Sequence, residues 1–295
     1  MEKKISLLKE IISKNLIETI RKATTKPPED LISLIKKTAS QEQNLISKTQ
    51  YDLILENFEY GSQNSIPLCQ DTGVLNFFIE LGNEFPIISN FKDLIEAAIL
   101  KATEQIPLRG NTVNPITNEN PENNLGVNAP QIYIDIIENS SNLKITVLPK
   151  GGGSENISKL FMLNPSTGLE EFKDKIINAV KDAGGMPCPP IILGIGIGGD
   201  ATACMNLAKK ALLRPLNQPH EWGNIANLEK ELKQKINDLN IGGMGLGGQS
   251  TCLAVHINIA MRHPASFPVG MVVQCYSHRI ASFQINREGT LINDL

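Results

Sequence analysis

The chain has 295 residues, and its 28 lysines and arginines stand against 31 aspartates and glutamates, which gives a formal net charge of −3. This balance provides no basic field for a nucleic-acid backbone or an anionic lipid surface, so we expect neither as a partner. No run of about 18 apolar residues is present, and charges interrupt the first segment, MEKKISLLKEIISKNL. The sequence therefore predicts a soluble, cytoplasmic protein with no membrane span and no signal peptide.

The N-terminal part of the chain has a helical pattern. Apolar residues recur at three- and four-residue steps over residues 4–22, which is typical of an amphipathic helix. Pro27 and Pro28 suit the first turn of a second helix that continues to Ile35, and residues 42–58 favour a third. Residues 1–58 therefore predict a helical cap without evident chemistry of its own.

Irregular, glycine- and asparagine-rich segments follow Gly61, and the longest covers residues 109–131. Such a long loop inside a compact domain is typical of a functional site, and the absence of charge runs argues against disorder. Later elements are predicted as a hairpin from QIYIDII and LKITVLP, helices at 169–183, 200–213 and 251–262, a buried strand PIILGIGI and a last strand VGMVVQC. We therefore expect a mixed α/β (α+β) fold in which 1–295 form one domain, with the cap at 1–58 and the core at 59–295.

Three glycine clusters need an explanation. The first, GIGIGG at 194–199, matches a dinucleotide-binding pattern, but no acid-ended strand follows about 20 residues later, and Asp200 suits a helix N-cap. The second and third, PKGGGSEN at 149–156 and IGGMGLGG at 241–248, could turn successive N–H groups toward an anion. Two such loops in an acidic protein indicate a small anionic ligand.

The cysteines divide by context. The chain has five cysteines, an odd number, and no C-x-x-C spacing. Neither disulfides nor a zinc finger is therefore supported. Cys204 and Cys252 lie in apolar runs, whereas the other three adjoin turns or polar residues: Cys69, Cys188 and Cys275. From context alone, a three-cysteine metal site and five buried thiols both remain open.

Several polar residues could take part in chemistry. Gln70 and Asp71 directly follow Cys69, and a bound cation would offset the repulsion between an aspartate and a thiolate. Arg109 could clamp a carboxylate with two hydrogen bonds or form a surface ion pair. His263 could cap the helix predicted before it. No G-x-S-x-G elbow, H-E-x-x-H or Walker loop is present, so serine, zinc-peptidase and phosphoryl-transfer chemistry lack support.

Three further polar residues have no evident catalytic context. His256 lies on the helix predicted at 251–262, where a buried core histidine is the simpler interpretation. His278 and Arg279 follow Cys275 closely, and they could either support a site or be exposed.

Six ordered motifs carry a resemblance to a known family. Together they look like the iron–sulfur-dependent (class I) fumarase and tartrate dehydratase family, specifically its N-terminal domain or α subunit, over residues 60–285. The motifs are CQDTG at 69–73, RGNTVNP at 109–115, PKGGGSEN at 149–156, CPPIILGIGIGG at 188–199, GMGLGGQST at 243–251 and RHPASFPV at 262–269.

The resemblance implies a cofactor and a site. One 4Fe–4S cluster would be held by three cysteines, leaving one iron open as a Lewis acid for substrate. By motif position, the implied ligands are Cys69, Cys188 and Cys275. The residues implied to line the substrate pocket are Gln70, Asp71, Arg109, Gly152 and His263. Asp71 or His263 would supply the proton for the departing hydroxyl.

The resemblance also implies a reaction and a partner. The leading reading is reversible hydration of fumarate to (S)-malate, with dehydration of L(+)-tartrate to oxaloacetate as the alternative. Because the chain stops at Leu295, soon after the third cysteine motif, we expect an α subunit that needs a separate β subunit, assembled as α₂β₂. Two other classes are weighed against these: a nucleotide-binding oxidoreductase, and a non-catalytic iron–sulfur scaffold that would not need the pocket residues.

Overall fold

A computed structural model describes residues 2–166 and 168–294. The chain divides into two compact units, which are described separately: Met1–Pro28, Asn57–Lys150 and Arg279–Leu295 form the first, and Glu29–Glu56 and Gly151–His278 form the second. The predicted mixed α/β class is confirmed, and the helical segment 1–58 is divided between the two units. No helix within the described residues is long and apolar enough to cross a membrane.

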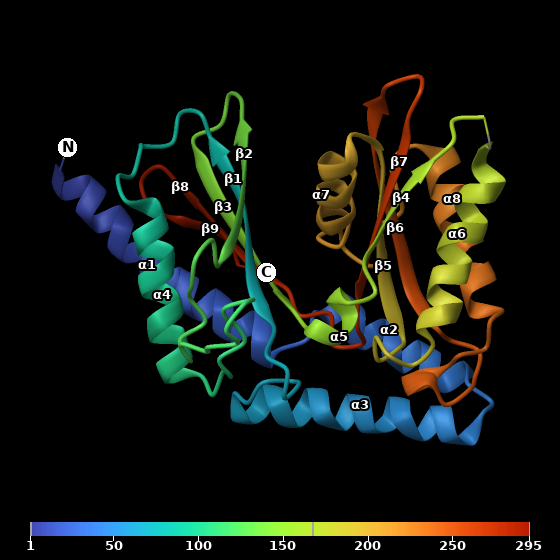
Figure 1. Ribbon diagram of the computed structural model, residues 1–295. Helices are drawn as coiled ribbons and strands as arrows, with labels where there is room; N and C mark the ends of the chain where they lie inside the picture. Colours follow the sequence, from blue (N-terminus) through green and yellow to red (C-terminus); the bar gives the residue numbers. More distant parts are fainter. Residues whose placement is uncertain (1, 167, 295) are drawn as a thin grey trace. The chain divides into compact units, whose positions relative to one another are not determined.

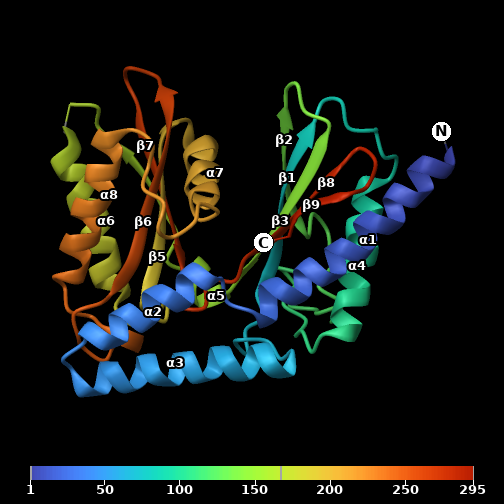
Figure 2. The same cartoon turned by 180° about the vertical axis from the view of Figure 1, so that it is seen from behind.

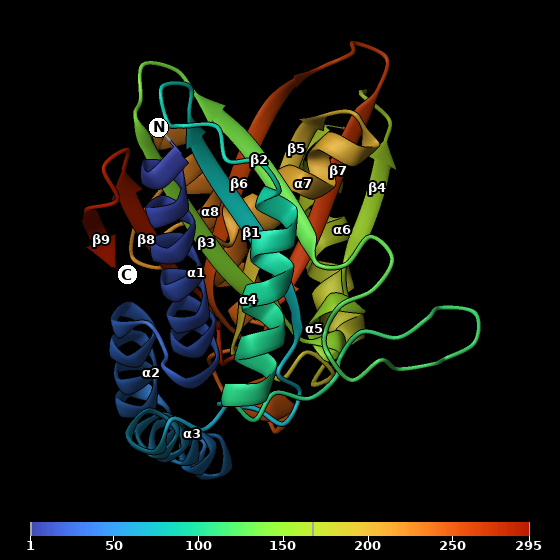
Figure 3. The same cartoon turned by 90° about the vertical axis from the view of Figure 1, so that its left-hand side faces the viewer.

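The first unit is a five-stranded sheet with two helices packed on one face (Figures 1 and 3). The strand order is β2-β1-β3-β8-β9, in which β1 and β2 are parallel and the other neighbours antiparallel. Its elements are α1 (Glu2–Thr25), β1 (Val74–Gly82), α4 (Phe91–Gln105), β2 (Gln131–Ile137), β3 (Asn142–Lys150), β8 (Ala281–Asn286) and β9 (Leu291–Asp294).

Helix α1 confirms the helix predicted at 4–22. Its apolar stripe packs into the core of the first unit together with residues of α4 and of the sheet, as expected for an amphipathic surface helix. The buried stripe consists of Leu8, Ile12, Leu16 and Ile20.

The predicted hairpin is wrong, although both of its strands exist. β1 lies between β2 and β3, so that Phe77 faces Ile132 on a parallel neighbour and Val147 on an antiparallel one. Phe77 and Phe78 point to opposite faces of the sheet and are both buried. In its central position, β1 has a neighbouring strand on each side and buries an aromatic side chain on each face of the sheet.

The second unit is a four-stranded sheet with α7 on one face and α6 and α8 on the other (Figures 1 and 2). The order is β4-β7-β5-β6, in which β5 and β6 are parallel and the remaining pairs antiparallel. Its elements are α2 (Glu29–Gln41), α3 (Leu45–Asn64, whose last residues belong to the first unit), α5 (Gly152–Glu155), β4 (Lys159–Leu163), α6 (Gly168–Ala183), β5 (Ile191–Gly199), α7 (Ala201–Ala211), α8 (Gly223–Asn237), the 3₁₀ turn η1 (Gly243–Gly245), β6 (Cys252–Arg262) and β7 (Phe267–Gln274).

The sequence predicted most of these elements correctly and one wrongly. The helices at 169–183 and 200–213 and the strands PIILGIGI and VGMVVQC are confirmed as α6, α7, β5 and β7. The segment predicted as a helix at 251–262 is strand β6, in which Val255 and Ile257 join the core while His256 faces the other side. β7 is also not the last strand, because β8 and β9 follow it in the first unit.

Glycines let α7 lie against β5 at backbone distance. A Cβ atom added at Gly196 would stand 1.9 Å from the carbonyl oxygen of Cys204, and one at Gly194 would stand 2.2 Å from that of Ala208. Asp200 caps α7, as predicted, and accepts the N–H of Ala203 at 2.7 Å. The first glycines of GIGIGG thus lie within the strand and serve helix packing, which removes the main support for a dinucleotide site.

This packing gives a stability prediction. Gly196→Ala should lower the free energy of unfolding by about 3 kcal/mol, because the added methyl group meets helix backbone that cannot turn aside. Urea unfolding followed by far-UV circular dichroism and by the fluorescence of Trp222, the one tryptophan of the sequence, measures the change.

Gly223→Ala is the matched control, because nothing lies within 4 Å of the added Cβ at the start of α8. It should leave stability unchanged or raise it by up to about 1 kcal/mol through helix propensity. Equal stability of the two variants would contradict the packing argument.

Candidate functional site

The loop that carries Cys69 joins α3 to β1 in the first unit. The N–H of Leu68 donates to the carbonyl of Thr24 at 3.0 Å, and the side-chain amide of Asn57 donates to the carbonyl of Leu68 at 2.9 Å. Cys69 follows this anchored residue as a half-buried free thiol, and Gln70 is exposed. The main chain leading to Cys69 is therefore held from two helices.

The end of this loop is fixed around Asp71. Its Oδ1 accepts the N–H of Gly73 at 3.0 Å, and its main-chain oxygen accepts a short hydrogen bond from the buried guanidinium of Arg279. Gly73 has a φ of 85°, and a Cβ there would stand 2.8 Å from the nitrogen of Lys150. Only glycine fits this position, which explains the last residue of the CQDTG motif.

Arg109 is attached to the same loop through Thr72. The Thr72 hydroxyl accepts the main-chain N–H of Arg109 at 3.1 Å and the side-chain amide of Asn111 at 2.9 Å. The Arg109 side chain is exposed, and its guanidinium makes no hydrogen bond or ion pair with the described residues. The structure thus places the main chain of Arg109 against the loop that carries Gln70 and Asp71, and a shared substrate pocket for these residues stays a prediction.

Asparagine side chains hold the long loop that begins at Arg109. The side chain of Asn124 accepts the N–H of Asn111 at 2.9 Å and donates to Thr103 of α4 at 3.1 Å. The side-chain amide of Asn120 donates to the carbonyl of Gly110 at 2.7 Å. The loop is therefore folded through its own polar side chains, in agreement with the argument against disorder.

In the second unit, the turns that carry Cys188 and Cys275 touch each other. The N–H of Tyr276 donates to the carbonyl of Cys188 at 3.1 Å. Cys188 is exposed and has a φ of 53°, a left-handed conformation that is uncommon for residues other than glycine. Cys275 is buried, and its Sγ lies 3.1 Å from the hydroxyl of Ser277. Two of the three predicted ligands are therefore neighbours.

The glycine turn with Gly152 lies against the Cys188 turn. Gly152 and Gly153 are exposed, and a Cβ at Gly153 would stand 3.3 Å from the carbonyl oxygen of Met186. The hydroxyl of Ser154 donates to the carbonyl of Gly151 at 3.1 Å. Gly152 is thus placed beside the Cys188 turn, and its role in a substrate pocket stays a prediction.

The prediction that the glycine cluster at 241–248 turns its N–H groups toward an anion is wrong. Its N–H groups bond within the chain: that of Gly243 to the hydroxyl of Ser47 at 2.8 Å, and that of Gln249 to the carboxylate of Glu42 at 2.9 Å. The N–H of Met244 donates to the carbonyl of Pro189 at 2.8 Å, directly beside Cys188. The cluster therefore supports the Cys188 turn.

The two remaining cysteines are core residues. Cys204 is buried in α7, and its thiol donates to the carbonyl of Ala201 at 3.3 Å. Cys252 is buried in β6, where burial raises the pKa of its thiol to about 12. A thiol that stays protonated is a poor metal ligand, which agrees with the division made from sequence context.

His263 lies in the turn between β6 and β7, at the far end of β7 from Cys275. β7 has 8 residues, so about 25 Å of strand separates the two positions. Arg262 holds this turn by donating to three carbonyls within it, and the N–H of Ala265 donates to Nδ1 of His263 at 3.1 Å. Within one chain, the structure does not bring His263 to the cysteine turns.

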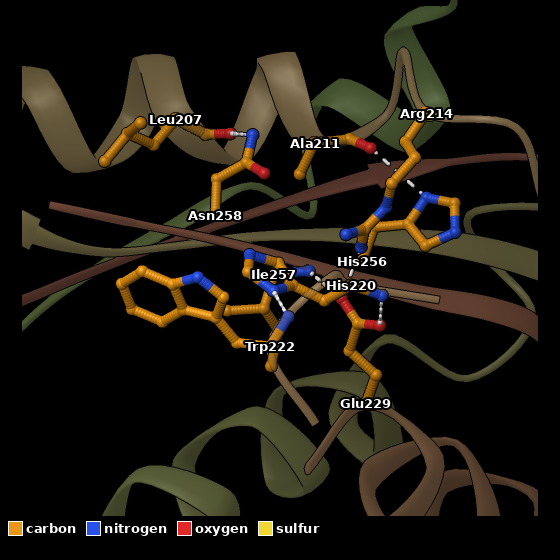
Figure 4. Close-up of polar contacts among 9 residues, drawn as sticks. All are labelled: Leu207, Ala211, Arg214, His220, Trp222, Glu229, His256, Ile257 and Asn258. Carbon is orange, nitrogen blue, oxygen red and sulfur yellow. Dashed lines mark hydrogen bonds and ion pairs between the residues drawn. The ribbon is translucent and has the colours of Figure 1, made fainter. Parts of the chain in front are cut away.

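His256 is a core histidine, as expected, although on a strand. Its Nδ1 lies 3.2 Å from the carbonyl oxygen of Ala211 (Figure 4), and burial, with the nearby charge of Arg214, lowers its pKa to about 3. Below it in the same view, Glu229 pairs with Arg214 and accepts the main-chain N–H of Ile257 at 2.8 Å. This polar cluster ties α8 and the segment before it to β6.

The residues that hold the loops and turns of the candidate site in place could not be identified from the sequence. In the first unit, the side-chain amide of Asn111 donates to the hydroxyl of Thr72. In the second unit, the N–H of Tyr276 joins the turns of Cys188 and Cys275. Across residues 2–166 and 168–294, no three His, Cys, Asp or Glu side chains form a metal-binding group. Cys69 belongs to the first unit, and Cys188 and Cys275 to the second, so the three-cysteine ligand set stays a prediction.

Comparison with known proteins agrees with the motifs. The family model described as fumarate hydratase (fumerase) matches residues 13–284. A protein of Methanocaldococcus jannaschii named "Putative L(+)-tartrate dehydratase subunit alpha" is 44% identical over 95% of this chain and 99% of its own length. The L(+)-tartrate dehydratase subunit alpha of Escherichia coli K12 is 30% identical over 92% of this chain and 89% of its own.

The family match covers the loop of Cys69 with Arg109 in the first unit and the joined turns of Cys188 and Cys275 in the second. The relatives are covered nearly end to end, so the similarity extends beyond one shared motif. This chain belongs to the fumarate hydratase family of hydro-lyases.

Proposed function

We propose that the chain is the α subunit of an iron–sulfur hydro-lyase that reversibly hydrates fumarate to (S)-malate. The observation that carries the proposal is the hydrogen bond from Tyr276 to the carbonyl of Cys188, which holds two cysteine turns side by side next to the Gly152 turn. The family match and the position of each motif add support.

The donor set suits a 4Fe–4S cluster. All three proposed ligands are thiols outside any disulfide, and thiolates are the donors that iron–sulfur clusters require. Cys69, Cys188 and Cys275 would hold it. A cluster bound there would supply an open iron as a Lewis acid toward a substrate oxygen.

The protein's own groups would hold a dicarboxylate. The main-chain N–H of Arg109 is hydrogen-bonded to Thr72, while its guanidinium is exposed. A guanidinium can clamp a carboxylate with two parallel hydrogen bonds. The exposed side-chain amide of Gln70 offers a further donor on the same loop. We assign the main-chain amide of Gly152 to a carboxylate as well.

Proton transfer to the departing hydroxyl is assigned to Asp71 or His263. Asp71 is positioned through its main-chain and side-chain hydrogen bonds. His263 accepts the N–H of Ala265 at Nδ1, so the neutral ring carries its proton on Nε2 and can donate it outward. Because β7 separates His263 from Cys275, we assign His263 to the site of a second copy of the chain.

The similar proteins bear on the substrate and on the subunit assembly. Dehydration of L(+)-tartrate to oxaloacetate is the second candidate, favoured by the names of the relatives from Methanocaldococcus jannaschii and Escherichia coli. Those names also describe alpha subunits, which supports a separate β subunit for this chain, and we assign the assembly as α₂β₂. An α subunit loaded with its cluster should turn over poorly alone.

The ligand set can be tested by iron content. After anaerobic reconstitution, the wild-type chain should hold about four irons and absorb broadly near 400 nm, as expected of a 4Fe–4S cluster. Cys69→Ala, Cys188→Ala and Cys275→Ala should each lose most of the iron and sulfide, because one of three ligands is missing.

Cys204→Ala is the control, since its thiol is used within α7. It should keep the full iron content. An iron-free wild-type chain after reconstitution, or equal iron in the control and the three variants, would refute the proposed ligand set.

Arg109 can be tested by steady-state kinetics of the enzyme assembled with its β subunit. Arg109→Met should raise the KM for fumarate about 100-fold, the size expected when a charged hydrogen-bond donor to a carboxylate is lost. Arg109→Lys should restore part of this loss, because the charge remains without the fork. Arg287→Met, which removes an exposed arginine of the β8–β9 turn, should leave KM unchanged.

The substrate can be decided on the same assembled enzyme. We expect kcat/KM for fumarate and (S)-malate to exceed that for L(+)-tartrate by at least about tenfold, since an unneeded hydroxyl is an imperfect fit worth about 1.4 kcal/mol or more. A preference for L(+)-tartrate would select the second candidate. The chain without its β subunit serves as the control for background turnover.

A further inference from the structure

Arg279 is a fully buried arginine that the proposed reaction does not use. It is 1% exposed and follows the Cys275 motif by four residues, although it belongs to the first unit. Its guanidinium donates to the main-chain oxygen of Asp71, and its Nε is buried without a partner.

This buried charge lacks a counter-ion. Among the residues that the structure describes, no carboxylate pairs with Arg279, and its contact with Asp71 is to the main chain and not to the side chain. The other deeply placed arginine of the fold behaves differently, because Arg214 pairs with Glu229. A buried cation without an acidic partner is costly, so folding alone does not account for it.

The position of Arg279 suggests its use. Asp71 stands two residues after Cys69 and one after Gln70, so a bond to its carbonyl fixes the main chain that carries both side chains. The groups that the proposed function brings to this loop are all anionic: a thiolate, a thiolate-bound cluster and a dicarboxylate. A buried positive charge behind the loop complements them.

We propose that Arg279 is a positioning residue that fixes the Cys69–Asp71 loop and holds an uncompensated positive charge for an anionic ligand of that loop. The choice of ligand rests on the proposed function. The pinning of the loop and the missing counter-ion are properties of the chain without any ligand, so they can be tested separately.

The experiment uses the full chain without its cluster and three variants: Arg279→Met, Arg279→Lys and the exposed control Arg287→Met. Hydrogen exchange of the main-chain amides at residues 70–73 should become about tenfold faster in Arg279→Met, the size expected for one lost bond from a charged donor. Arg279→Lys should restore most of the protection, and Arg287→Met should match the wild type.

Thermal unfolding of the same proteins tests whether the buried charge of Arg279 lacks a counter-ion. Because Arg279→Met replaces an unpaired buried charge by an apolar side chain of similar length, its unfolding midpoint should equal or exceed that of the wild type. Unchanged exchange at 70–73 would overturn the positioning role, and a midpoint several degrees lower would overturn the uncompensated charge.

Reconstitution separates this proposal from the proposed function. If the wild-type chain binds the cluster, Arg279→Met should shift its reduction potential to a more negative value, because a nearby positive charge favours the reduced, more anionic state. A potential equal to that of the wild type would contradict the link to the ligand. A wild-type chain that binds no iron would refute the proposed function, while exchange and unfolding still decide the role of Arg279.

Discussion

The antiparallel pairing of β5 with β7 sets the geometry of the candidate site. Ile192, near the start of β5, faces Gln274, the last residue of β7. Cys188 precedes β5 and Cys275 follows β7, so the register itself brings the two turns to the same end of the sheet. The hydrogen bond from Tyr276 to Cys188 follows from this register, and the glycine cluster that supports Pro189 reinforces it.

The same register separates other residues of the motif set. At the opposite end of the pair, Ile197 faces Val269, so the end of β5 and the turn with His263 lie together there. Glycines in β5 let α7 pack against this part of the sheet at backbone distance. Within the second unit, the turn with His263 and the turns with Cys188 and Cys275 therefore lie at opposite ends of the pair β5–β7.

Local patterns in the sequence predicted elements well and their pairing poorly. The stripe of α1 and the apolar runs of β5 and β7 are local signals, and they were sufficient. The pairing of β1 with both β2 and β3 depends on burial of Phe77 and Phe78 on two faces of a sheet, which no local pattern shows. The helix prediction for the segment that forms β6 was wrong for a related reason. This strand is buried over its first six residues, so its apolar run resembles that of a buried helix.

In the sequence, the cysteines were divided by whether the side chain sits in an apolar run or at a turn, and desolvation gives this division a physical basis. Burial holds the pKa of Cys252 at about 12 and that of His256 at about 3, so both stay neutral and unreactive near pH 7. Turn residues such as Cys188 avoid this penalty. Arg279 breaks the rule, since its partner is a main-chain oxygen 208 positions away in the sequence. Main-chain acceptors carry no sequence signature, so a buried charge that acts through one can be found only in the folded chain.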